Sequence, residues 1–398
     1  MTSRSHRLIH VVGTSAGGHW FLLQASQLVG RGHQLLAVLP DEGPLADSLR
    51  GVGVEVRVVR FLGSSWRSLP RVARAQLELI WIMARHRPTV AHYHLFKAII
   101  MGRIAAWIAR VPVRISQWPG SAQFDVPILA RLDRATVWMD DLVVGSCRDI
   151  AIRAGRAGAS RTAVVYYGLD TSAWDVSAPE LAQAHALVLE ELGIPDPSTR
   201  LVGMVGYMYP TKSRAFREIG VKGHEVLIDA AALLVARLDD VHFVLVGDEF
   251  VGDGSYRAEL EGRVKRLGLE GHVSFLGHRH DIARLTRAFD ILVVPSMSES
   301  ASYAAMQALL LERPVVGSRV GGIPDTVQHG ETGMLVEPGS PQALAEGIAE
   351  LLKSPSIREA MGRLGRRRVL ERFDITKTVD DLEALYDRLV EQHAGAAR

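Results

Sequence analysis

The sequence of 398 residues is poor in cysteine and in lysine. A single cysteine, Cys147, excludes a disulfide framework and a zinc cluster built on cysteines. Only six of the 46 basic residues are lysines, a bias that by default reflects genome composition. The net charge is +2 and no basic tail is present, so the composition does not favour a nucleic-acid partner. Because hydrophobic residues make up 47%, disorder is excluded as the main state.

Long apolar runs are missing as well. No segment reaches the roughly 18 apolar residues that a membrane span needs. The N-terminus is polar over residues 1–7, and the apolar run at 8–12 is only strand-sized, so no signal peptide is expected. These features predict a cytoplasmic protein whose contact with a membrane, if any, is peripheral.

Three catalytic signatures are also absent. The sequence contains no Asp-x-Asp, no GxxxxGK[ST] phosphate loop, and no cluster of histidine and aspartate with metal spacing. We therefore expect neither a resident metal nor a cofactor.

Short β-branched runs alternate with helical patterns in two blocks of the chain. Fully apolar strands that alternate with helices are typical of parallel sheets covered on both faces, so we predict an α/β fold with two doubly wound, Rossmann-like domains. Ligands of such sheets bind outside the carboxyl ends of the strands. The predicted strands are 8–12, 34–39, 54–59, 89–94, 113–117, 142–145 and 163–167, then 201–205, 241–246, 273–276, 291–294 and 314–317. A linker with three prolines, at 171–199, separates the blocks, and the chain is predicted to be helical after Pro341.

The most informative motif spans residues 295–308. A strand is predicted to end at Val294 and a helix to begin near Ser302, so free N–H groups at the helix start favour a phosphate or sugar oxygen. Glu299 lies in the turn just before them and can accept hydrogen bonds from hydroxyls. Taken alone, the motif is equally compatible with a capped helix that carries a surface glutamate.

The surrounding motifs make the pattern specific. Downstream lie Pro314-Val315-Val316-Gly317, Gly321-Gly322 and Gly330-Glu331-Thr332-Gly333, and upstream lies Phe275-Leu276-Gly277-His278-Arg279. This array resembles the nucleotide-sugar domain of the retaining glycosyltransferases of family 4, which have the GT-B fold. The resemblance covers nearly the whole chain, with Gly17-Gly18, Arg31-Gly32-His33, Tyr167-Gly168-Leu169-Asp170 and Arg372-Phe373 in order.

The resemblance implies three parts of the chain. Residues 1–190 would form an acceptor-binding domain, residues 191–372 a nucleotide-sugar-binding domain, and residues 373–398 a helix that packs back on the first domain.

The resemblance also implies roles for the 295–308 motif. Glu299 matches the first signature glutamate, which holds the donor-sugar hydroxyls. Ser300, Ala301 and Ser302 stand where the family has a Gly-aromatic-Gly turn, and their amides would reach the sugar and diphosphate. Gln307 stands in place of the second glutamate, which binds the ribose. A glutamine keeps a carbonyl acceptor but loses the charge, so we expect altered ribose binding; the alternative is a damaged site.

The diphosphate-binding positions depart from the family in part. Tyr207 stands where relatives have an arginine, whereas Lys222 matches the family's lysine at a helix start. A lysine there would neutralise the charge that grows on the leaving diphosphate. The intervening insertion carries Lys212 and Arg214, which would either replace the missing arginine or lie in a solvated loop.

Further positions follow from the resemblance. Gly247 matches a turn at the donor site, and Arg279 belongs to a loop that meets the base through backbone groups. In the first domain, Gly17 and Gly18 would let a loop approach the donor phosphate or the acceptor. Their spacing does not fit the GxGxxG pattern of dinucleotide-binding proteins.

Two aromatic residues are candidates for acceptor binding. His94 lies at the carboxyl end of a predicted strand and fits a family position near the cleft, although a buried structural histidine is an equal alternative. Trp118 stands where many relatives place a sugar-binding histidine, and an indole can stack on a sugar ring.

The predicted helix at 69–85 carries Arg71, Arg74 and Arg85, with Trp66 and Trp81 nearby. Such a helix can meet an anionic membrane or a lipid-linked acceptor. The alternative is an ordinary amphipathic helix that covers a sheet.

The resemblance therefore predicts a retaining transferase that moves a hexosyl or N-acetylhexosaminyl group from a UDP-sugar without a metal. The acceptor would be a sugar, a lipid-linked sugar or a natural product, and the protein a monomer or homodimer. Two alternatives remain: an epimerase or hydrolase of nucleotide-sugars on the same fold, and a nucleotide-sugar-binding protein without catalysis.

Overall fold

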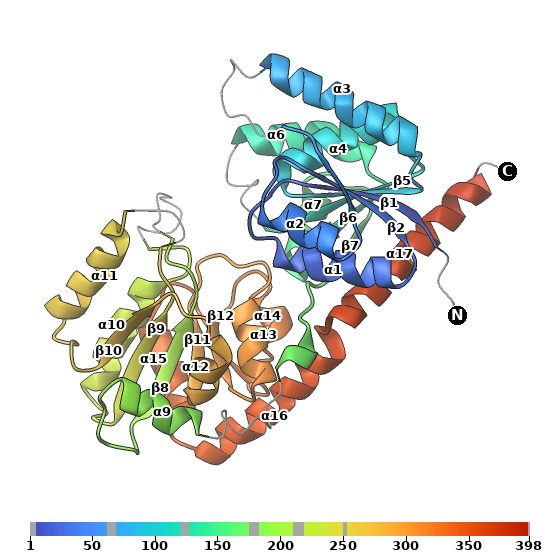
Figure 1. The fold of residues 1–398 in the computed structure, drawn as a ribbon. Helices are drawn as coiled ribbons and strands as arrows, with labels where there is room; N and C mark the ends of the chain where they lie inside the picture. The colour runs from blue at the N-terminus through green and yellow to red at the C-terminus, as the bar shows by residue number, and fades with distance from the viewer. Residues whose placement is uncertain are drawn as a thin grey trace. The chain divides into compact units, whose positions relative to one another are not determined.

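The computed structural model describes residues 5–61, 69–120, 127–174, 183–209, 219–249 and 253–396. The chain forms two compact units, Met1–Asp170 with Phe373–Arg398, and Thr171–Arg372 (Figure 1). Each unit contains a parallel sheet with helices, so the predicted α/β fold class is confirmed.

The first unit is built on a seven-stranded parallel sheet. Its strand order is β3-β2-β1-β4-β5-β6-β7, and His10 of β1 pairs with His92 of β4. The strands are β1 (Arg7–Val12), β2 (Gln34–Leu39), β3 (Glu55–Val58), β4 (Val90–His94), β5 (Val113–Trp118), β6 (Leu142–Gly145) and β7 (Thr162–Val164).

Two helical layers cover this sheet. Because successive side chains of a strand point to opposite faces, Ile9 and Val11 pack with α3, α4 and α7, whereas Leu8 and Val12 pack with α1, α2 and α17. The helices of the first layer are α3 (Leu69–His86), α4 (Phe96–Ile108) and α7 (Arg148–Arg156), with α6 (Pro127–Thr136) and the short η2 (Val137–Met139) beside α4. Those of the second layer are α1 (His19–Gly30), α2 (Pro44–Gly51) and α17 (Ile375–Ala396).

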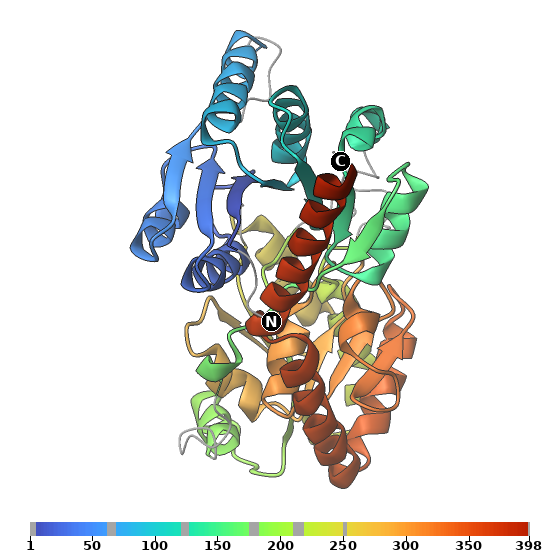
Figure 2. The same cartoon turned by 90° about the vertical axis from the view of Figure 1, so that its right-hand side faces the viewer.

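The C-terminal helix α17 is attached to the first unit by its polar as well as its apolar face. Leu169 and Ile375 meet in a backbone hydrogen bond of 2.8 Å, where the chain re-enters the unit. His33 Nε2 lies 2.7 Å from Glu383 Oε1, and Arg31 donates to the same carboxylate. The long red helix beside the blue and green strands in Figure 2 is α17.

The second unit is built on a six-stranded parallel sheet of order β10-β9-β8-β11-β12-β13. From β8 the chain fills one side of the sheet through β9 and β10, and then returns to β11 on the other side of β8. The strands are β8 (Arg200–Val205), β9 (Val241–Val246), β10 (Val273–Gly277), β11 (Ile291–Val294), β12 (Val315–Ser318) and β13 (Gly333–Val336). The helices are η3 (Thr171–Ala173), α9 (Ala184–Glu191), α10 (His224–Val235), α11 (Ser255–Arg266), α12 (Ile282–Ala288), α13 (Tyr303–Leu310), α14 (Ile323–Thr326), α15 (Pro341–Leu352) and α16 (Pro355–Arg372).

The boundary between the units differs from the one expected at 190/191. Helix α9 begins at Ala184, before that position, yet it packs on α12, and its last residue, Glu191, binds Arg279 and Arg284 of the second unit. The second unit therefore begins at Thr171.

Within the described ranges, no helix is both long enough and apolar enough to cross a bilayer.

Candidate active site

A pocket of about 370 Å³ lies at the carboxyl edge of β8 and β11. The chain leaves these neighbouring strands toward opposite sides of the sheet, and such a switch point is where open α/β sheets bind ligands. The pocket brings together six of the predicted residues: Tyr207, Lys222, Glu299, Ala301, Ser302 and Gln307. Its other lining residues are Met204, Val205, Gly206, Tyr209, Val293, Val294, Pro295, Ser296, Tyr303 and Ala304.

An ion pair lies at the centre of this pocket. Lys222 Nζ donates to Glu299 Oε2 at 2.6 Å, with one tenth of the glutamate side chain and about a quarter of the lysine side chain exposed. Both groups are therefore desolvated in part, yet each remains reachable from the pocket. The pair combines a cation that suits phosphate with a carboxylate that suits hydroxyl groups.

A glycine places the lysine. Gly223 caps α10 with a φ of 75°, and a Cβ there would lie 2.0 Å from the carbonyl oxygen of Pro295. The backbone of Met297 also donates to the oxygen of Val221 at 2.8 Å. Because only glycine permits this approach, the loop before α10 lies directly against the turn that carries Glu299.

The glutamate turn is held from its other side by the loop after β12. The amide of Gly322 donates to the oxygen of Glu299 at 3.2 Å. At Gly321, with a φ of 53°, an added Cβ would lie 1.6 Å from that same oxygen. The Gly-Gly motif at 321–322 thus positions the backbone of Glu299.

Helix α13 begins at the pocket. The side chain of Ser302 accepts a hydrogen bond from the amide of Ala305, so the capped helix considered for this motif is present. The first turn of α13 lines the pocket together with Gln307. The partial positive charge of the helix start therefore adds to that of Lys222.

Sequence reasoning missed two residues that support the lysine loop. Glu225 is buried, accepts the amide of Gly220 with both carboxylate oxygens at 3.1 Å, and accepts the hydroxyl of Tyr256 at 2.7 Å. A Cβ at Gly220 would lie 1.9 Å from that hydroxyl. The signal was a glutamate in the first turn of a mostly apolar helix, three residues after Lys222.

The remaining donor-site candidates of the second unit lie outside the pocket lining. Ser300 donates its amide to Glu299 Oε1 at 3.3 Å. Gly247, with a φ of 131°, lets the ends of β8 and β9 approach, since a Cβ there would lie 2.0 Å from the oxygen of Gly206. Lys212 and Arg214 fall outside the described residues.

Arg279 is engaged elsewhere in its own unit. Its guanidinium binds Asp281 through two contacts of 2.8 Å and also binds Glu191. The hydrogen bond with Asp281, followed by the one with Glu191, raises the pKa of Arg279. The hydrogen bond from Arg279 in turn lowers the pKa of Asp281. A direct side-chain contact of Arg279 with a nucleotide remains a prediction.

In the first unit, Gly17 and Gly18 lie between β1 and α1, with φ angles of 70° and 74°. A Cβ at Gly18 would lie 2.9 Å from the side chain of Leu45, whereas one at Gly17 would meet no atom within 4 Å. Gly17 therefore lies at an open position beyond the carboxyl end of β1.

His94 belongs to a buried cluster that the sequence spacing did not reveal. His10, His92 and His94 place their ring nitrogens within 4.8 Å of one another, which corrects the expectation that no histidine cluster has metal spacing. His10 reaches its partners from β1, because β1 and β4 are paired strands. The rings already bond to one another and to the protein: His10 Nδ1 lies 2.9 Å from His94 Nε2, and His92 Nδ1 lies 2.8 Å from the hydroxyl of Tyr386.

This cluster is electrically neutral near physiological pH. Burial, followed by the neighbouring histidine His33, lowers the pKa of His10 to about 3. Burial and the adjacent imidazoles also hold the pKa values of His92 and His94 well below the usual range. His94 is therefore a buried histidine in this structure, which was the alternative to acceptor binding, and 1% of the residue is exposed.

Trp118 departs from its predicted use. The residue is fully buried in the core formed with Val143, Cys147 and Ile150, because its position on β5 points its indole toward the α4–α7 face of the sheet. Its ring faces are therefore not accessible for stacking on a sugar in this structure.

Two family models match the chain. A glycosyl transferase 4-like domain matches residues 18–168, and a glycosyl transferases group 1 domain matches residues 214–368. Together with the two parallel sheets and the pocket at the switch point, these matches define a glycosyltransferase of the GT-B class. Within that class, the chain belongs to the family 4 type.

Curated relatives carry transferase names. N-acetyl-alpha-D-glucosaminyl L-malate synthase of Bacillus anthracis is 33% identical over 42% of this chain and 42% of its own length. D-inositol 3-phosphate glycosyltransferase of Corynebacterium glutamicum (strain R) is 33% identical over 58% of this chain and 52% of its own length. The matched part thus spans about half of these relatives.

Solved structures share the fold. Anabaena HepE in complex with UDP has a TM-score of 0.79 and 24% identity, covering 96% of this chain and 100% of that one. The sucrose-phosphate synthase of Thermosynechococcus elongatus has a TM-score of 0.74 and 21% identity, covering 97% of this chain and 100% of the synthase. At these identities the likeness supports the GT-B fold.

Proposed function

We propose that this chain transfers a hexosyl or N-acetylhexosaminyl group from a UDP-sugar to an acceptor hydroxyl, with retention at the anomeric carbon. The observation that carries the proposal is the Lys222–Glu299 pair at the switch point of the second sheet, beside the start of α13. The transferase names of the relatives, and the crystal structure of HepE in complex with UDP-glucose, support it.

In this proposal the ion pair separates when the donor binds. Lys222 moves its contact from Glu299 to the donor diphosphate, where its charge counters the negative charge that grows on the leaving group. Glu299 then accepts hydrogen bonds from the donor-sugar hydroxyls, and the carbonyl of Gln307 accepts from the ribose. The amides at the start of α13 add donors toward the diphosphate.

The reaction itself uses the donor's own phosphate as the base. The bond between the anomeric carbon and the diphosphate oxygen breaks while the acceptor oxygen bonds to that carbon on the same face. The proton of the acceptor hydroxyl passes to the leaving phosphate oxygen, so the products are the glycosylated acceptor and UDP. The protein's contribution is positioning and charge stabilisation, and the step needs no metal.

Two alternatives differ in what leaves the site. A nucleotide-sugar hydrolase or epimerase would transfer the sugar to water or invert a sugar carbon. A binding protein, which Tyr207 and Gln307 would favour as departures from the family pattern, would hold UDP-sugar unchanged. In the proposed transfer, by contrast, the sugar leaves on an acceptor that is a sugar, a lipid-linked sugar or a natural product.

The test compares two pocket variants with two surface variants of the same unit. Lys222→Ala and Glu299→Ala should each lower the rate of sugar transfer by about 10² to 10³, because each removes a group that acts on the charge or orientation of the reacting donor. Lys265→Ala and Glu270→Ala change exposed residues and should leave the rate unchanged. The readout is product mass over a panel of UDP-sugars and acceptors, with UDP release measured in parallel.

Each outcome decides between the candidates. Unchanged transfer in both pocket variants would contradict the assignment of the site. UDP release that yields free sugar with every acceptor indicates a hydrolase, and UDP-induced thermal stabilisation without any product indicates a binding protein.

A further inference from the structure

Among its described residues, the first unit exposes large apolar side chains on only one of its two helical layers. Trp81 on α3 is 62% exposed, Trp138 on η2 is 58% exposed, and Trp107 on α4 is 46% exposed. Leu77, Ile108 and Leu132 on the same layer are exposed as well. On the opposite layer, in α1, α2 and the described part of α17, no large apolar side chain is exposed. Large apolar side chains that are exposed on one layer alone point to a surface that meets an apolar partner.

Helix α3 presents two different faces. Its inner face buries Leu79, Ile82 and Met83 in the core shared with α4. Its outer face carries Arg74, Leu77, Trp81 and Arg85, at spacings of three or four residues that form one stripe of the helix. Apolar side chains flanked by arginines at both ends are typical of a helix that lies in a membrane interface.

The second part of the surface is formed by α4, α6 and η2. Trp107 and Trp138 meet edge to face, with ring centroids 5.8 Å apart. The indole N–H of Trp138 donates to the oxygen of Ala135 at 2.9 Å, so its polar atom is satisfied while its ring stays exposed. Arg131 and Arg134 are exposed on α6, which precedes η2 directly.

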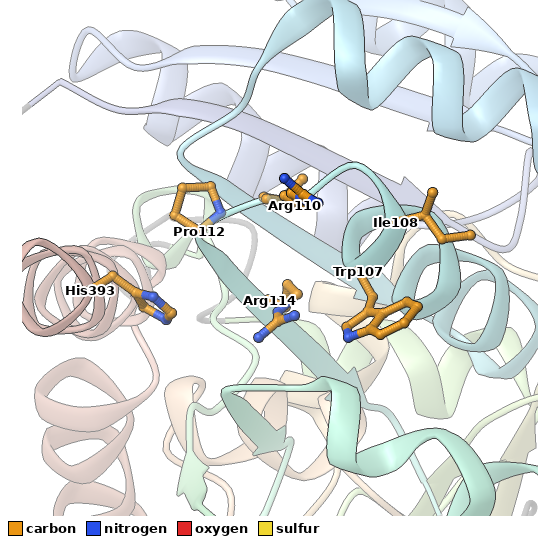
Figure 3. Close-up of a pocket in the computed structure, with 7 residues that line it drawn as sticks. Trp107, Ile108, Arg110, Pro112, Arg114 and His393 are labelled. Carbon is orange, nitrogen blue, oxygen red and sulfur yellow. The ribbon is translucent and has the colours of Figure 1, made fainter. Parts of the chain in front are cut away.

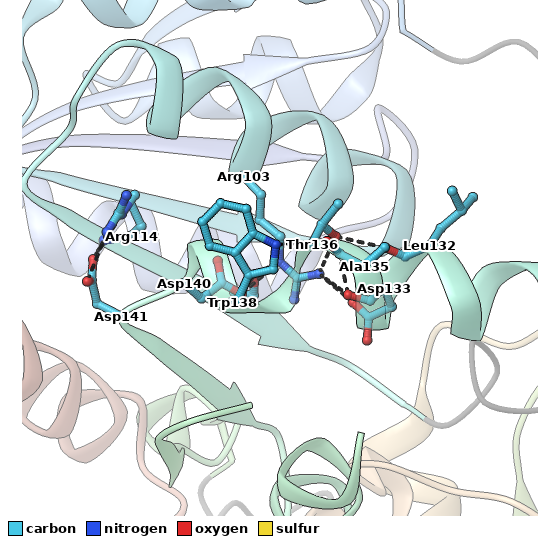
Figure 4. Close-up of polar contacts among 10 residues, drawn as sticks. Arg103, Arg114, Leu132, Asp133, Ala135, Thr136, Trp138, Asp140 and Asp141 are labelled. Carbon is cyan, nitrogen blue, oxygen red and sulfur yellow. Dashed lines mark hydrogen bonds and ion pairs between the residues drawn. The ribbon is translucent and has the colours of Figure 1, made fainter. Parts of the chain in front are cut away.

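A buried ion network joins α4, α6 and β5 beneath this part. Arg103 of α4, fully buried, donates to Asp133 of α6 and to Asp140 after η2, as Figure 4 shows. Ser116 of β5 donates to Asp140 at 2.7 Å. The network therefore attaches α6 and the end of η2 to α4 and β5.

The surface continues into a pocket of about 590 Å³ at the end of α4. Trp107, Ile108 and Arg110 line it together with Arg114, Pro112 and His393 (Figure 3). Arg114 is bound by Asp141, whereas Arg110 forms no ion pair with any described residue. The pocket thus shares the mixed apolar and basic character of α3 and α6.

The charge of the first unit is divided in the same way as its apolar surface. Helix α3 has three arginines and one glutamate, Glu78, whereas α17 on the opposite layer has five acidic residues and two basic ones. The exposed arginines Arg71, Arg74 and Arg85 form no ion pair with a described residue. These arginines of α3 therefore favour contact of this layer with an anionic surface. On α17, by contrast, Asp380 and Glu383 are bound by Arg31, and Asp381 by Lys377.

We propose that the exposed side chains of α3, the end of α4, α6 and η2, here called the aromatic-basic face, bind the surface of an anionic phospholipid membrane. The indoles insert at the level of the headgroups, and the arginines bind lipid phosphates. This inference does not depend on the proposed sugar transfer, because lipid binding by this face requires neither donor nor acceptor.

The test measures sedimentation of the full chain with large unilamellar vesicles. Vesicles of phosphatidylcholine alone are compared with vesicles that contain phosphatidylglycerol as well, at low and at high salt. We expect binding to the anionic vesicles that weakens with salt. Arg71→Gln combined with Arg74→Gln should weaken it about thirtyfold, from about 1 kcal/mol per basic residue near an anionic surface.

A second pair of variants separates the tryptophans from the charge. Trp81→Ser combined with Trp138→Ser should reduce binding to anionic vesicles while the net charge stays the same. The matched control is Arg363→Gln combined with Leu364→Ser, because both residues are exposed on α16 of the second unit. Circular dichroism and thermal melting, measured for every variant, show whether the chain remains folded.

Three results would overturn the proposal. They are absence of wild-type binding to anionic vesicles at low salt, equal loss of binding in the α16 control, and self-association that the tryptophan variants abolish without any effect on vesicles. The last result would assign the face to a contact between two copies of the chain. Loss of sugar transfer with intact vesicle binding would contradict only the proposed function.

Discussion

Tyr256 contacts Glu225, which supports the lysine loop, and does not line the pocket. Its hydroxyl donates to the carboxylate that holds the amide of Gly220, two residues before Lys222. Burial, followed by the adjacent Glu225, raises the pKa of this phenol well above its usual value, so the hydroxyl stays protonated and remains a donor.

Tyr256→Phe removes this donor while it keeps the ring. A lost hydrogen bond to a charged group costs about 1.5–3 kcal/mol. We expect part of this loss to weaken the attachment of the loop that carries Lys222. We expect a lower kcat with a smaller change in the KM for the donor, measured by steady-state kinetics. Equal kinetics for the variant and the wild type would show that Glu225 holds the loop without the tyrosine.

The histidine cluster predicts a pH dependence of folding. The pKa of His10 is about 3 in the folded chain, against an ordinary value of 6.5, and those of His92 and His94 are also lowered. The unfolded chain therefore binds more protons than the folded chain below pH 6.5. The free energy of unfolding should rise with pH through that window and fall as the pH drops from about 6.5 toward 3.

Urea unfolding of the full chain between pH 7.5 and 5 measures this effect. Each histidine that protonates only on unfolding adds a slope of about 1.4 kcal/mol per pH unit. His10→Asn should therefore lower the slope by the contribution of one histidine, about 1.4 kcal/mol per pH unit. A slope that the substitution leaves unchanged would mean that His10 is protonated in the folded state.

At the scale of elements, the buried network of Arg103 connects α4 to α6 and to the start of β6. Arg103→Ala would leave two buried carboxylates without their cation, which costs about 3–5 kcal/mol. We expect the first unit to melt at a lower temperature in calorimetry. Arg114→Ala, on a partly exposed pair with Asp141, should cost less and is the matched control.

Most of the strands could be predicted from the sequence because apolar β-branched runs dominate them. The strand β13 was not predicted, since its four residues lie beside a glycine-rich turn and were interpreted as part of a motif. The helix α2 was missed for a similar reason: it has eight residues and begins with a proline between two short strands. Short elements depend on neighbours that are distant in sequence, and these are invisible without the structure.

The residues of the candidate site also differ in whether the sequence alone predicts them. Glu299, Lys222 and Gln307 could be predicted because each lies close to a strand end or helix start within a recognisable motif. Glu225 and Tyr256 could not, because their contact joins residues 31 apart in sequence. Trp118 was misplaced because strand alternation alone does not say which face of a sheet its last residue takes.

At the scale of the whole molecule, the chain has two Rossmann-like units of similar size, and the second contains the described pocket with the Lys222–Glu299 pair. The first unit contributes the glycine loop after β1 and the aromatic-basic face. We therefore propose donor binding for the second unit and contact with a membrane surface for the first.

The central claim is that the pocket transfers a sugar with retention. Proton NMR of the anomeric signal, followed from the start of the reaction of the wild type with a UDP-hexose and an acceptor, tests it most directly. We predict a product with the anomeric configuration of the donor, formed together with UDP, and almost none of it with Lys222→Ala. A product of inverted configuration, or free sugar without glycosylated acceptor, would contradict this claim.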